Sequence, residues 1–505
     1  MLSTQWNANK QISRQIYQLC RGLAQKVRKI YFKYIFILNL EEAKPYADIP
    51  GPSKLQLIRA FLPGGNVAGT DLVLTMNPQD YEVIFRNEGQ YPYRRSFEVM
   101  DYFKRVHRRE VFDGYDGLTS GNGPAWGKMR TAVNPILLQP RNAKLYMTNL
   151  VQVSDEFLER IRIIRDPVTQ EMPDDFAVDI RHLVIESICS VALNTHLGLL
   201  GEQRNNKDIQ KLVLALQDVV ELGFQLDIMP AFWKYLPMPN FKKLMRSLDT
   251  ITDFCYFHIG NALKRIEEDA KAGTLNEIGL ETSLLEKLAR FDRQTAVIIA
   301  MDLLFAGADP TLVTLGGILF SLSKSPDKQA RLLEEIRGIL PNKDSSLTIE
   351  NMRNLPYLRA CIKEGIRMYP IGPGTLRRMP HDVVLSGYRV VAGTDVGIAA
   401  NYQMANMEQF VPKVREFIPE RWLRDESNSH LVGETATPFM YLPFGFGPRS
   451  CAGKRIVDMM LEIAISRLVR NFKIGFDYPI ENAFKAQFFV QPNIPFKFKF
   501  IERNE

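Results

Sequence analysis

Apolar residues recur every three or four positions over long stretches in the middle of the chain. The segments 145–165, 208–224 and 241–272 all show this spacing, which places their apolar side chains on one face of a helix. Shorter segments at 71–76, 383–398 and 487–501 are rich in β-branched and aromatic residues and predict strands. The pattern therefore predicts a mostly α fold with small β-sheets.

Two apolar segments raise the question of a membrane. The segment 295–323 resembles a membrane span, but Asp302, Asp309 and Pro310 interrupt it. Because acidic side chains at mid-membrane depth are costly, we expect a long buried helix that crosses the core. The segment 223–240 is rich in aromatic residues and proline and is too short to span a bilayer. It is either core packing or a patch that contacts a membrane surface peripherally.

The first 40 residues differ from the rest in charge. They carry seven Lys or Arg residues and no Asp or Glu, with apolar residues at helical spacing. This composition is typical of a mitochondrial transit peptide, although a solvated amphipathic helix has the same pattern. The apolar run 34–38 is far shorter than a spanning helix needs. We therefore predict a transit peptide at 1–40 and a single catalytic domain at 41–505.

Composition and charge exclude several classes of protein. The chain has 505 residues and a net charge of +7, and the leader accounts for the whole excess, so the remainder is neutral. We see no basic face with interleaved aromatic residues and expect no nucleic-acid partner. The five cysteines and six histidines are dispersed, without the spacings of a disulfide framework or a zinc site. A cysteine with a chemical role would therefore act alone.

The most informative stretch is 444–453, with the sequence FGFGPRSCAG. Its glycines allow positive φ angles and let backbone N–H groups face the sulfur of Cys451, and Gly453 lets the next helix lie close to a flat ligand. We expect that helix to run over about 452–469, with its positive N-terminal end stabilising a thiolate at Cys451. A buried structural cysteine needs none of these features.

This stretch resembles the haem-ligand loop of the cytochrome P450 monooxygenases. The resemblance covers nearly the whole chain after residue 45, with the other motifs of that family in the same order. It implies that Cys451 is the axial thiolate ligand of the iron of haem b, where it favours O–O bond cleavage. It also implies a single large P450 fold, with haem between a long central helix and the cysteine loop.

Further motifs that resemble the family's imply roles around haem. Glu364 and Arg367 match its Glu-x-x-Arg pair, and Arg421 matches the arginine of its Pro-x-Arg-aromatic segment. In the family these three side chains form a buried network beneath the haem loop. Buried haem propionates also need paired donors. Our candidates for cofactor binding are Trp126, Arg130, Arg378, Phe444, Arg449 and Gly453.

The stretch 306–311, AGADPT, resembles the oxygen-binding part of the family's central helix. In the family, small residues leave room for O₂ and substrate, and an acid followed by threonine relays protons. Here Asp309 supplies the acid, but Pro310 occupies the usual threonine position. Thr311 lies about 100° further round the helix, so either Thr311 or a water performs the relay. The resemblance thus implies Asp309 and Thr311 as catalytic residues.

The leader without a spanning anchor resembles the mitochondrial branch of the family, and the detailed motifs look closest to its insect members. The resemblance implies electrons from NADPH through a ferredoxin reductase and an acidic, adrenodoxin-like iron–sulfur ferredoxin. It also implies a peripheral location on the matrix side of the inner membrane. The predicted docking residues, for which a solvated helix face is the alternative, are Arg359, Lys363, Lys454 and Arg455.

The resemblance leaves the substrate and one alternative reaction open. It implies a small apolar substrate, either a xenobiotic such as an insecticide or a steroid. A haem-thiolate protein with an altered proton relay could instead be an isomerase or a peroxygenase, or a haem sensor that uses neither ferredoxin nor O₂. Coupling of reduced ferredoxin to a hydroxylated product distinguishes these possibilities.

Overall fold

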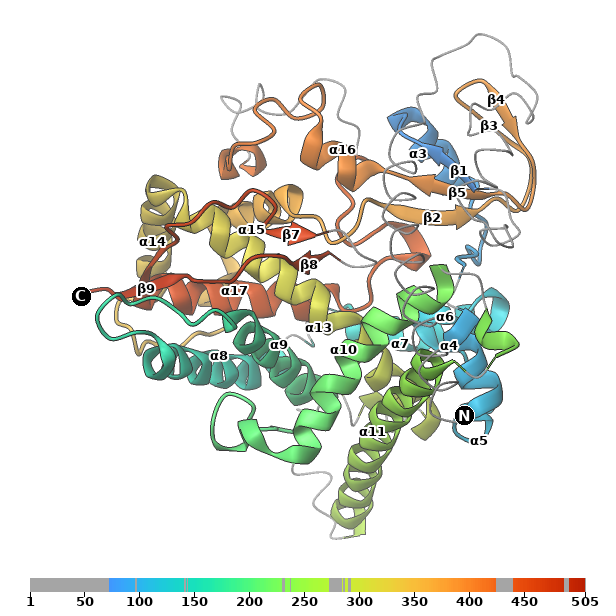
Figure 1. Ribbon diagram of the computed structural model, residues 1–505, viewed down its shortest axis with the longest axis horizontal. Coiled ribbons are helices and arrows are strands. Elements are labelled where there is room, and N and C mark those ends of the chain that lie inside the picture. Colours follow the sequence, from blue (N-terminus) through green and yellow to red (C-terminus); the bar gives the residue numbers. More distant parts are fainter. Residues whose placement is uncertain are drawn as a thin grey trace, which may run out of the picture.

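A computed structural model describes most of the chain from residue 72 onward. The described residues are 72–95, 98–139, 142, 144–228, 232–236, 238–271, 284, 287–288, 292–423, 439–485 and 490–504. The predicted transit peptide at 1–40, and residues 41–71 at the start of the predicted catalytic domain, lie outside them. Most of the described chain is helical, as the spacing of apolar residues predicts (Figure 1).

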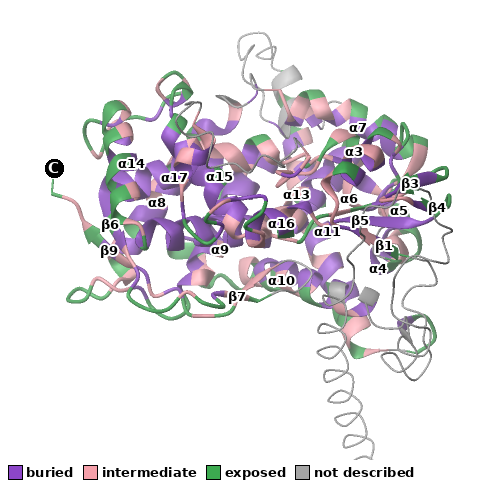
Figure 2. Cartoon of the chain, turned by 90° about the horizontal axis from the view of Figure 1, so that it is seen from above, coloured by how far each residue is buried: buried purple, intermediate pink, exposed green. Residues whose placement is uncertain are grey.

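The long helix α13, Arg293–Ser323, runs through the middle of the molecule, and most of its residues are buried (Figure 2). Within the described residues it is the one helix long and apolar enough to cross a membrane, and most of its apolar stretch lies inside the protein. Its two acids, Asp302 and Asp309, are buried and accept hydrogen bonds from neighbouring elements. The prediction of a buried core helix is confirmed.

The helices that pack most extensively on α13 are α9 (Phe176–Ala192), α11 (Pro239–Lys271) and α15 (Pro356–Met368). α8 (Lys144–Ile164) packs between α9 and α17 (Lys454–Asn471), and α10 (Lys207–Ile228) packs against α11. The helices predicted from spacing thus correspond to α8, α10 and α11. The other α-helices are α3 (Pro78–Arg86), α4 (Glu98–Tyr102), α5 (Arg109–Phe112), α6 (Gly117–Ser120), α7 (Gly123–Leu137), α14 (Pro326–Ile339) and α16 (Ala400–Asn406).

Within the described ranges, four small sheets accompany the helices. In the largest, β5 (Asp395–Ile398) lies between β1 (Leu72–Thr75), which is parallel to it, and β2 (Thr375–Arg378), which is antiparallel. The hairpin of β3 (Val383–Leu385) and β4 (Tyr388–Val390) turns through Ser386 and Gly387, both with positive φ, as tight hairpins require. The remaining pairs are β6 (Phe472–Gly475) with β9 (Lys499–Glu502) and β7 (Phe484–Lys485) with β8 (Gln491–Pro492).

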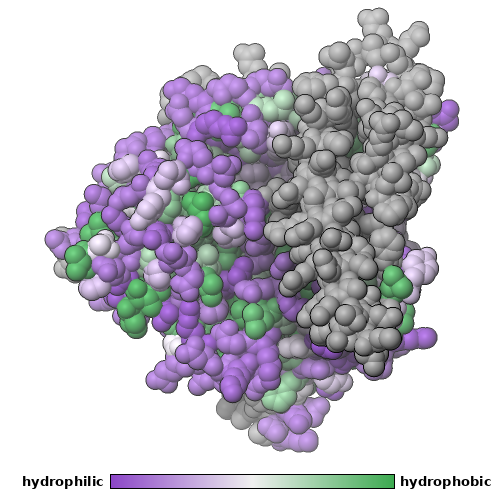
Figure 3. Space-filling model, in the orientation of Figure 1, coloured by the Kyte–Doolittle hydropathy of each residue, from purple (hydrophilic) through white to green (hydrophobic). Residues whose placement is uncertain are grey.

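The apolar core has two parts that meet near the cysteine loop. The larger cluster fills the helical region, and the smaller one lies around the β1–β5–β2 sheet and α3. Met440, just before the loop, belongs to the smaller cluster, whereas Ile456, just after it, belongs to the larger. The loop therefore joins the two parts. On the described part of the face in Figure 3, hydrophilic side chains predominate and hydrophobic ones form small groups.

Close contact between α13 and α15 depends on Gly365. A Cβ atom at this position would lie 2.5 Å from Ile318 Cγ1 and 3.3 Å from Ile318 Cα. We expect Gly365→Ala to lower the free energy of unfolding by about 1–2 kcal/mol, because overpacking outweighs the better helix propensity of alanine. Chemical denaturation followed by circular dichroism measures this. Gly338→Ala in α14, where a Cβ meets nothing within 4 Å, should cost nothing, and equal losses in both variants would contradict the explanation.

Candidate active site

The loop at 444–453 forms a compact turn that presents Cys451. Its backbone is closed by hydrogen bonds from Cys451 N to Phe444 O at 2.8 Å and from Ser450 N to Gly447 O at 3.1 Å. Gly445 and Gly447 have φ values of +72° and +66°, which other residues rarely adopt. A Cβ at Gly447 would also lie 2.6 Å from Glu88 Oε1. Glycine is therefore required at these turns, as the sequence pattern predicts.

Cys451 differs from the other cysteines that the structure describes. Cys189, Cys255 and Cys361 are buried, whereas Cys451 keeps exposed surface. Burial among protein atoms nevertheless raises the pKa of the Cys451 thiol, and the Gly453 N–H, Arg130 and Lys454 oppose that rise. The expected helix start is corrected, because α17 begins at Lys454 and Gly453 precedes it as the cap. The predicted stabilisation of the thiolate thus comes from one N–H and two cations. Together these groups lower the pKa of the thiol by less than burial raises it.

Guanidinium groups with incomplete hydrogen bonding surround the cysteine loop. Arg130 on α7 donates from Nη2 to Ser450 O at 2.8 Å, and Arg449 donates to Pro92 O and to Asn122 Oδ1, both at 2.7 Å. Among the described residues, the buried Arg130 Nε and Arg449 Nη1 have no partner. Burial and three neighbouring arginines lower the pKa of Arg449 to about 9. Buried donors left unpaired are costly, so the site fits a ligand with carboxylates such as haem.

Two predicted cofactor-binding side chains, Trp126 and Arg378, have protein partners. The Trp126 indole N–H donates to Leu118 O at 3.2 Å, and its ring lies 3.6 Å from the Arg449 guanidinium carbon. Arg378 forms a bidentate ion pair with Asp395, at 2.7 and 2.9 Å. Trp126 therefore supports Arg449, and Arg378 is directed to the neighbouring strand. Neither contact was foreseen from the sequence.

Arg377 and Arg94 are two arginines near the loop that sequence reasoning missed. Successive residues of a strand face opposite ways, and on β2 it is Arg377, not Arg378, that is buried toward the loop. Arg377 pairs with Glu88 and donates to Phe446 O at 3.2 Å. Arg94 donates to Thr119 O at 2.7 Å, and the charge of Cys451 influences its pKa, which burial lowers. In the sequence, the adjacent residues Arg377 and Arg378 indicated an arginine that faces the loop, and the pattern fitted either of these two residues.

The predicted support network is assembled around one buried carboxylate. Glu364 accepts two hydrogen bonds from Arg367 at 2.9 Å and one from Arg421 Nε at 3.1 Å. It also accepts from the Trp422 indole at 2.9 Å and from the Ile418 backbone N–H at 3.1 Å. Sequence reasoning grouped the first three residues and missed the last two donors. A buried charge with this many donors holds α15 against the segment that leads to the cysteine loop.

On α13, the two predicted relay residues are engaged by protein groups. Asp309 accepts from Arg181 Nε at 3.1 Å and from Gln491 Nε2 at 3.0 Å. The Thr311 hydroxyl donates to Gly307 O at 2.7 Å. Gln491 lies on β8, so the acid connects the central helix to the C-terminal hairpin. Near this segment α13 approaches the loop, since a Cβ at Gly453 would lie 3.8 Å from Leu303 Cδ2.

Asp302, one helical turn before Ala306, holds the segment that carries α6. It accepts from Leu118 N at 2.7 Å and from Thr119 Oγ1 at 2.7 Å, and Lys104 Nζ lies 3.6 Å away. Because Thr119 O accepts from Arg94 and Leu118 O accepts from Trp126, this segment links α13 to the arginines around the loop. Asp302 entered the sequence argument only as an interruption of an apolar run.

The four predicted docking cations lie on α15 and at the start of α17. Arg359 forms an ion pair with Glu462 at 2.8 Å, and Lys454 forms one with Asp458 at 2.7 Å. Lys363 Nζ lies 5.9 Å from the centre of the Trp422 ring. Arg455 is exposed and forms no ion pair within the part of the chain that the structure describes. Arg359 and Lys454 are thus paired with acids of α17, whereas Lys363 contacts the Trp422 ring.

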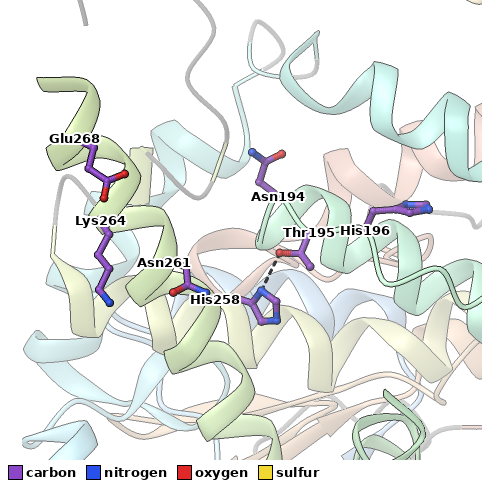
Figure 4. Close-up of a pocket in the computed structure, with 7 residues that line it drawn as sticks. All are labelled: Asn194, Thr195, His196, His258, Asn261, Lys264 and Glu268. Carbon is purple, nitrogen blue, oxygen red and sulfur yellow. Dashed lines mark hydrogen bonds between the residues drawn. The ribbon is translucent and has the colours of Figure 1, made fainter. Parts of the chain in front are cut away.

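A surface pocket of about 520 Å³ lies elsewhere, between α11 and the chain that follows α9 (Figure 4). His258 on α11 and Thr195 face each other across it and share a hydrogen bond of 3.0 Å. Lys264 and Glu268 add opposite charges to its lining. None of the predicted site residues lines this pocket.

A helical fold, an accessible cysteine in a glycine-rich loop and unpaired guanidinium groups around it define a haem-thiolate protein. Comparison with known proteins agrees, because the cytochrome P450 family model matches residues 64–500. The chain belongs to the cytochrome P450 family. It is a monooxygenase that carries haem b, and the predicted family, fold class, enzyme class and cofactor are confirmed.

Several insect proteins are similar to this chain. It is 93% identical to "Probable cytochrome P450 12e1, mitochondrial" of Drosophila melanogaster, with all of both chains covered. It is 42% identical to "Cytochrome P450 CYP12A2" of Musca domestica, with 95% of each chain covered. It is 41% identical to "Probable cytochrome P450 12a5, mitochondrial" of Drosophila melanogaster, over 91% of this chain and 92% of that one. The predicted mitochondrial location agrees with the names of the two Drosophila proteins.

If Cys451 is the iron ligand, Cys451→Ser should abolish the thiolate-type Soret band of the reduced carbon monoxide complex, because an alcohol does not replace the thiolate. Absorbance of the purified protein measures this. Cys361→Ser is the matched control, since Cys361 is buried on α15 and its loss should leave the band in place. An unchanged band in Cys451→Ser would remove Cys451 from the site.

The role of Arg377 is tested against its neighbour on β2. Arg377→Leu should reduce haem retention several-fold, because Phe446 O loses its donor and the buried Glu88 is left unpaired. Haem content per protein after gel filtration measures the loss. The Arg377→Leu/Glu88→Leu pair removes the unpaired charge and should still retain less haem than the native protein. Retention lost more in Arg378→Leu than in Arg377→Leu would restore the original candidate.

Proposed function

We propose that this protein inserts one oxygen atom from O₂ into a small apolar substrate, either a xenobiotic such as an insecticide or a steroid. The other oxygen atom takes up two electrons and two protons and leaves as water. The electrons come from NADPH through a ferredoxin reductase and an acidic, adrenodoxin-like ferredoxin. The observation that carries the proposal is Cys451, accessible in its glycine loop beside the unpaired donors of Arg130 and Arg449.

The chain's own residues hold and orient the cofactor in this proposal. Bound haem b supplies the iron at which O₂ is activated. Cys451 would provide the thiolate, and Arg130 Nε and Arg449 Nη1 would donate to the haem carboxylates. Phe444 and Gly453 would border the ring, since Phe444 O fixes Cys451 and Gly453 approaches α13. The Glu364 network would keep this support rigid.

Protons must reach the oxygen-binding side along α13. Pro310 has no N–H, so the carbonyl of Ala306, one turn earlier, lacks its helical donor. The Thr311 hydroxyl is occupied by Gly307 O, and Asp309 is held by Arg181 and Gln491. We therefore assign proton transfer to a water held by the Ala306 carbonyl near Asp309, with Thr311 as a support.

The docking face for ferredoxin would consist of Lys363, Lys454 and Arg455, with Arg359 in a supporting position. These cations lie on α15 and at the start of α17, on the cysteine side of the fold. Opposite charge speeds the encounter of redox partners. In the segment predicted as a possible membrane patch, Tyr235 is 84% exposed and Leu236 59% exposed. This exposure supports peripheral contact with a membrane. We propose that the contact is with the matrix side of the inner mitochondrial membrane, and that residues 1–40 are removed to leave a single domain at 41–505.

The altered relay is the observation that favours the alternative functions, which are an isomerase, a peroxygenase or a haem sensor. Pro310 occupies the position of the usual threonine. An isomerase or a peroxygenase would not need protons delivered during ferredoxin-driven turnover, and a haem sensor would not need turnover at all. Reduced ferredoxin with O₂ should give hydroxylated product from a panel of steroids and insecticides. Product formed with hydrogen peroxide but not with ferredoxin and O₂ would favour the peroxygenase.

The relay is tested in the same assay. Asp309→Asn should slow product formation by about 10- to 100-fold, because proton transfer by a placed side chain contributes this much or more. Thr311→Val keeps the side chain's shape and should retain most of the coupling, since its hydroxyl is bonded within the helix. Hydrogen peroxide and product are measured together at equal haem content. Full coupling in both variants would remove the relay from this segment, and uncoupling in Thr311→Val alone would assign it to Thr311.

A further inference from the structure

Acidic residues on α17 lie beside two of the predicted docking cations. Lys454, Asp458 and Glu462 follow at intervals of four residues, so they share one face of the helix. Asp458 Oδ2 lies 2.7 Å from Lys454 Nζ, and Glu462 Oε1 lies 2.8 Å from Arg359 Nε. An acidic partner that approaches this face must therefore compete with carboxylates that belong to the protein itself.

The two ion pairs differ in how firmly they are built. Glu462 is 14% exposed and contacts both Nε and Nη2 of Arg359, at 2.8 and 3.3 Å. Arg359 also donates to Arg353 O and Met352 O, both at 2.8 Å, so it fastens α15 to α17 and to the preceding turn. This guanidinium is largely committed to the fold.

The pair of Lys454 and Asp458 is by contrast open to exchange. The side chains are 44% and 27% exposed and meet through one contact. Exposed pairs of this kind contribute little to stability, because both groups are well solvated and screened. A carboxylate from outside can therefore replace Asp458 on Lys454 at small cost. The neighbouring Arg455 is exposed and would add attraction at the same point.

We propose that Asp458 regulates ferredoxin docking by competing with the partner's carboxylates for Lys454, an inference that rests on the proposed ferredoxin-driven function. In the free protein Asp458 neutralises Lys454. In the complex a ferredoxin carboxylate takes its place, and the affinity is lower than Lys454 alone would give. A weaker complex suits a partner that carries one electron at a time, because it must leave before the second delivery.

The same pair adjoins the cysteine loop. Lys454 Nζ lies 4.8 Å from the centre of the Phe444 ring, and Phe444 O accepts the Cys451 N–H. A negative charge here favours the oxidised iron, so its removal should raise the reduction potential of the holoenzyme even without ferredoxin.

The test measures the Kd of the haem-loaded enzyme for an acidic mitochondrial-type ferredoxin. Asp458→Asn should tighten binding about two- to fivefold at low ionic strength, the range expected for an exposed ion pair. Asp477→Asn is the matched control, because it removes the same charge from a residue that pairs with Lys499 beyond the other end of α17. In the Lys454→Gln background the gain from Asp458→Asn should disappear.

The outcomes separate the inference from the function on which it rests. If Lys454→Gln and Arg455→Gln weaken binding but Asp458→Asn behaves like Asp477→Asn, competition by Asp458 is wrong and the docking face stands. If neither Lys454→Gln nor Arg455→Gln changes the Kd, the docking face is wrong and the inference falls with it. Potentiometry of the isolated holoenzyme adds a second readout, and an unchanged potential in Asp458→Asn would overturn the link to Cys451.

Discussion

Burial of positive charge beside Cys451 is the constraint on which the site depends. Guanidinium groups from α7, β2 and the loop itself converge on a short turn, and burial with mutual repulsion lowers the pKa of Arg449 to about 9. Only part of this charge is balanced, by Glu88 on Arg377. Proteins rarely leave buried donors unpaired. The arrangement becomes favourable when an anionic cofactor fills it, so binding and local order are coupled.

The Glu364 network shows the opposite solution to the same physical problem. Its carboxylate is buried as deeply, yet every oxygen has protein donors, from Arg367, Arg421 and Trp422. A satisfied network of this kind is rigid and needs no ligand. The hydrogen bonds of the Glu364 network are therefore complete without a cofactor. The network provides a rigid support against which the cysteine loop can bind one.

Much of this architecture follows from local sequence. The spacing of apolar residues places α8, α10 and α11, because one face of each helix must be buried whatever its partner. The continuous apolar run places α13, which is buried on nearly all sides. Gly445 and Gly447 fix the turn, since other residues rarely adopt their positive φ values. The Glu-x-x-Arg spacing brings Glu364 to Arg367 because residues three apart share a helix face. These features depend on neighbours within a few residues.

What only the tertiary structure decided is which partner each charged side chain finds. The sequence determined that two arginines stand together on β2, and the sheet decided that Arg377 faces the loop while Arg378 meets Asp395. It determined an acid at Asp309, and distant α9 and β8 supplied Arg181 and Gln491 to hold it. It determined cations at Arg359 and Lys454, and α17 decided how each is neutralised. The physical reason is range: backbone conformation responds to adjacent residues, whereas an ion pair forms wherever folding brings opposite charges within about 4 Å.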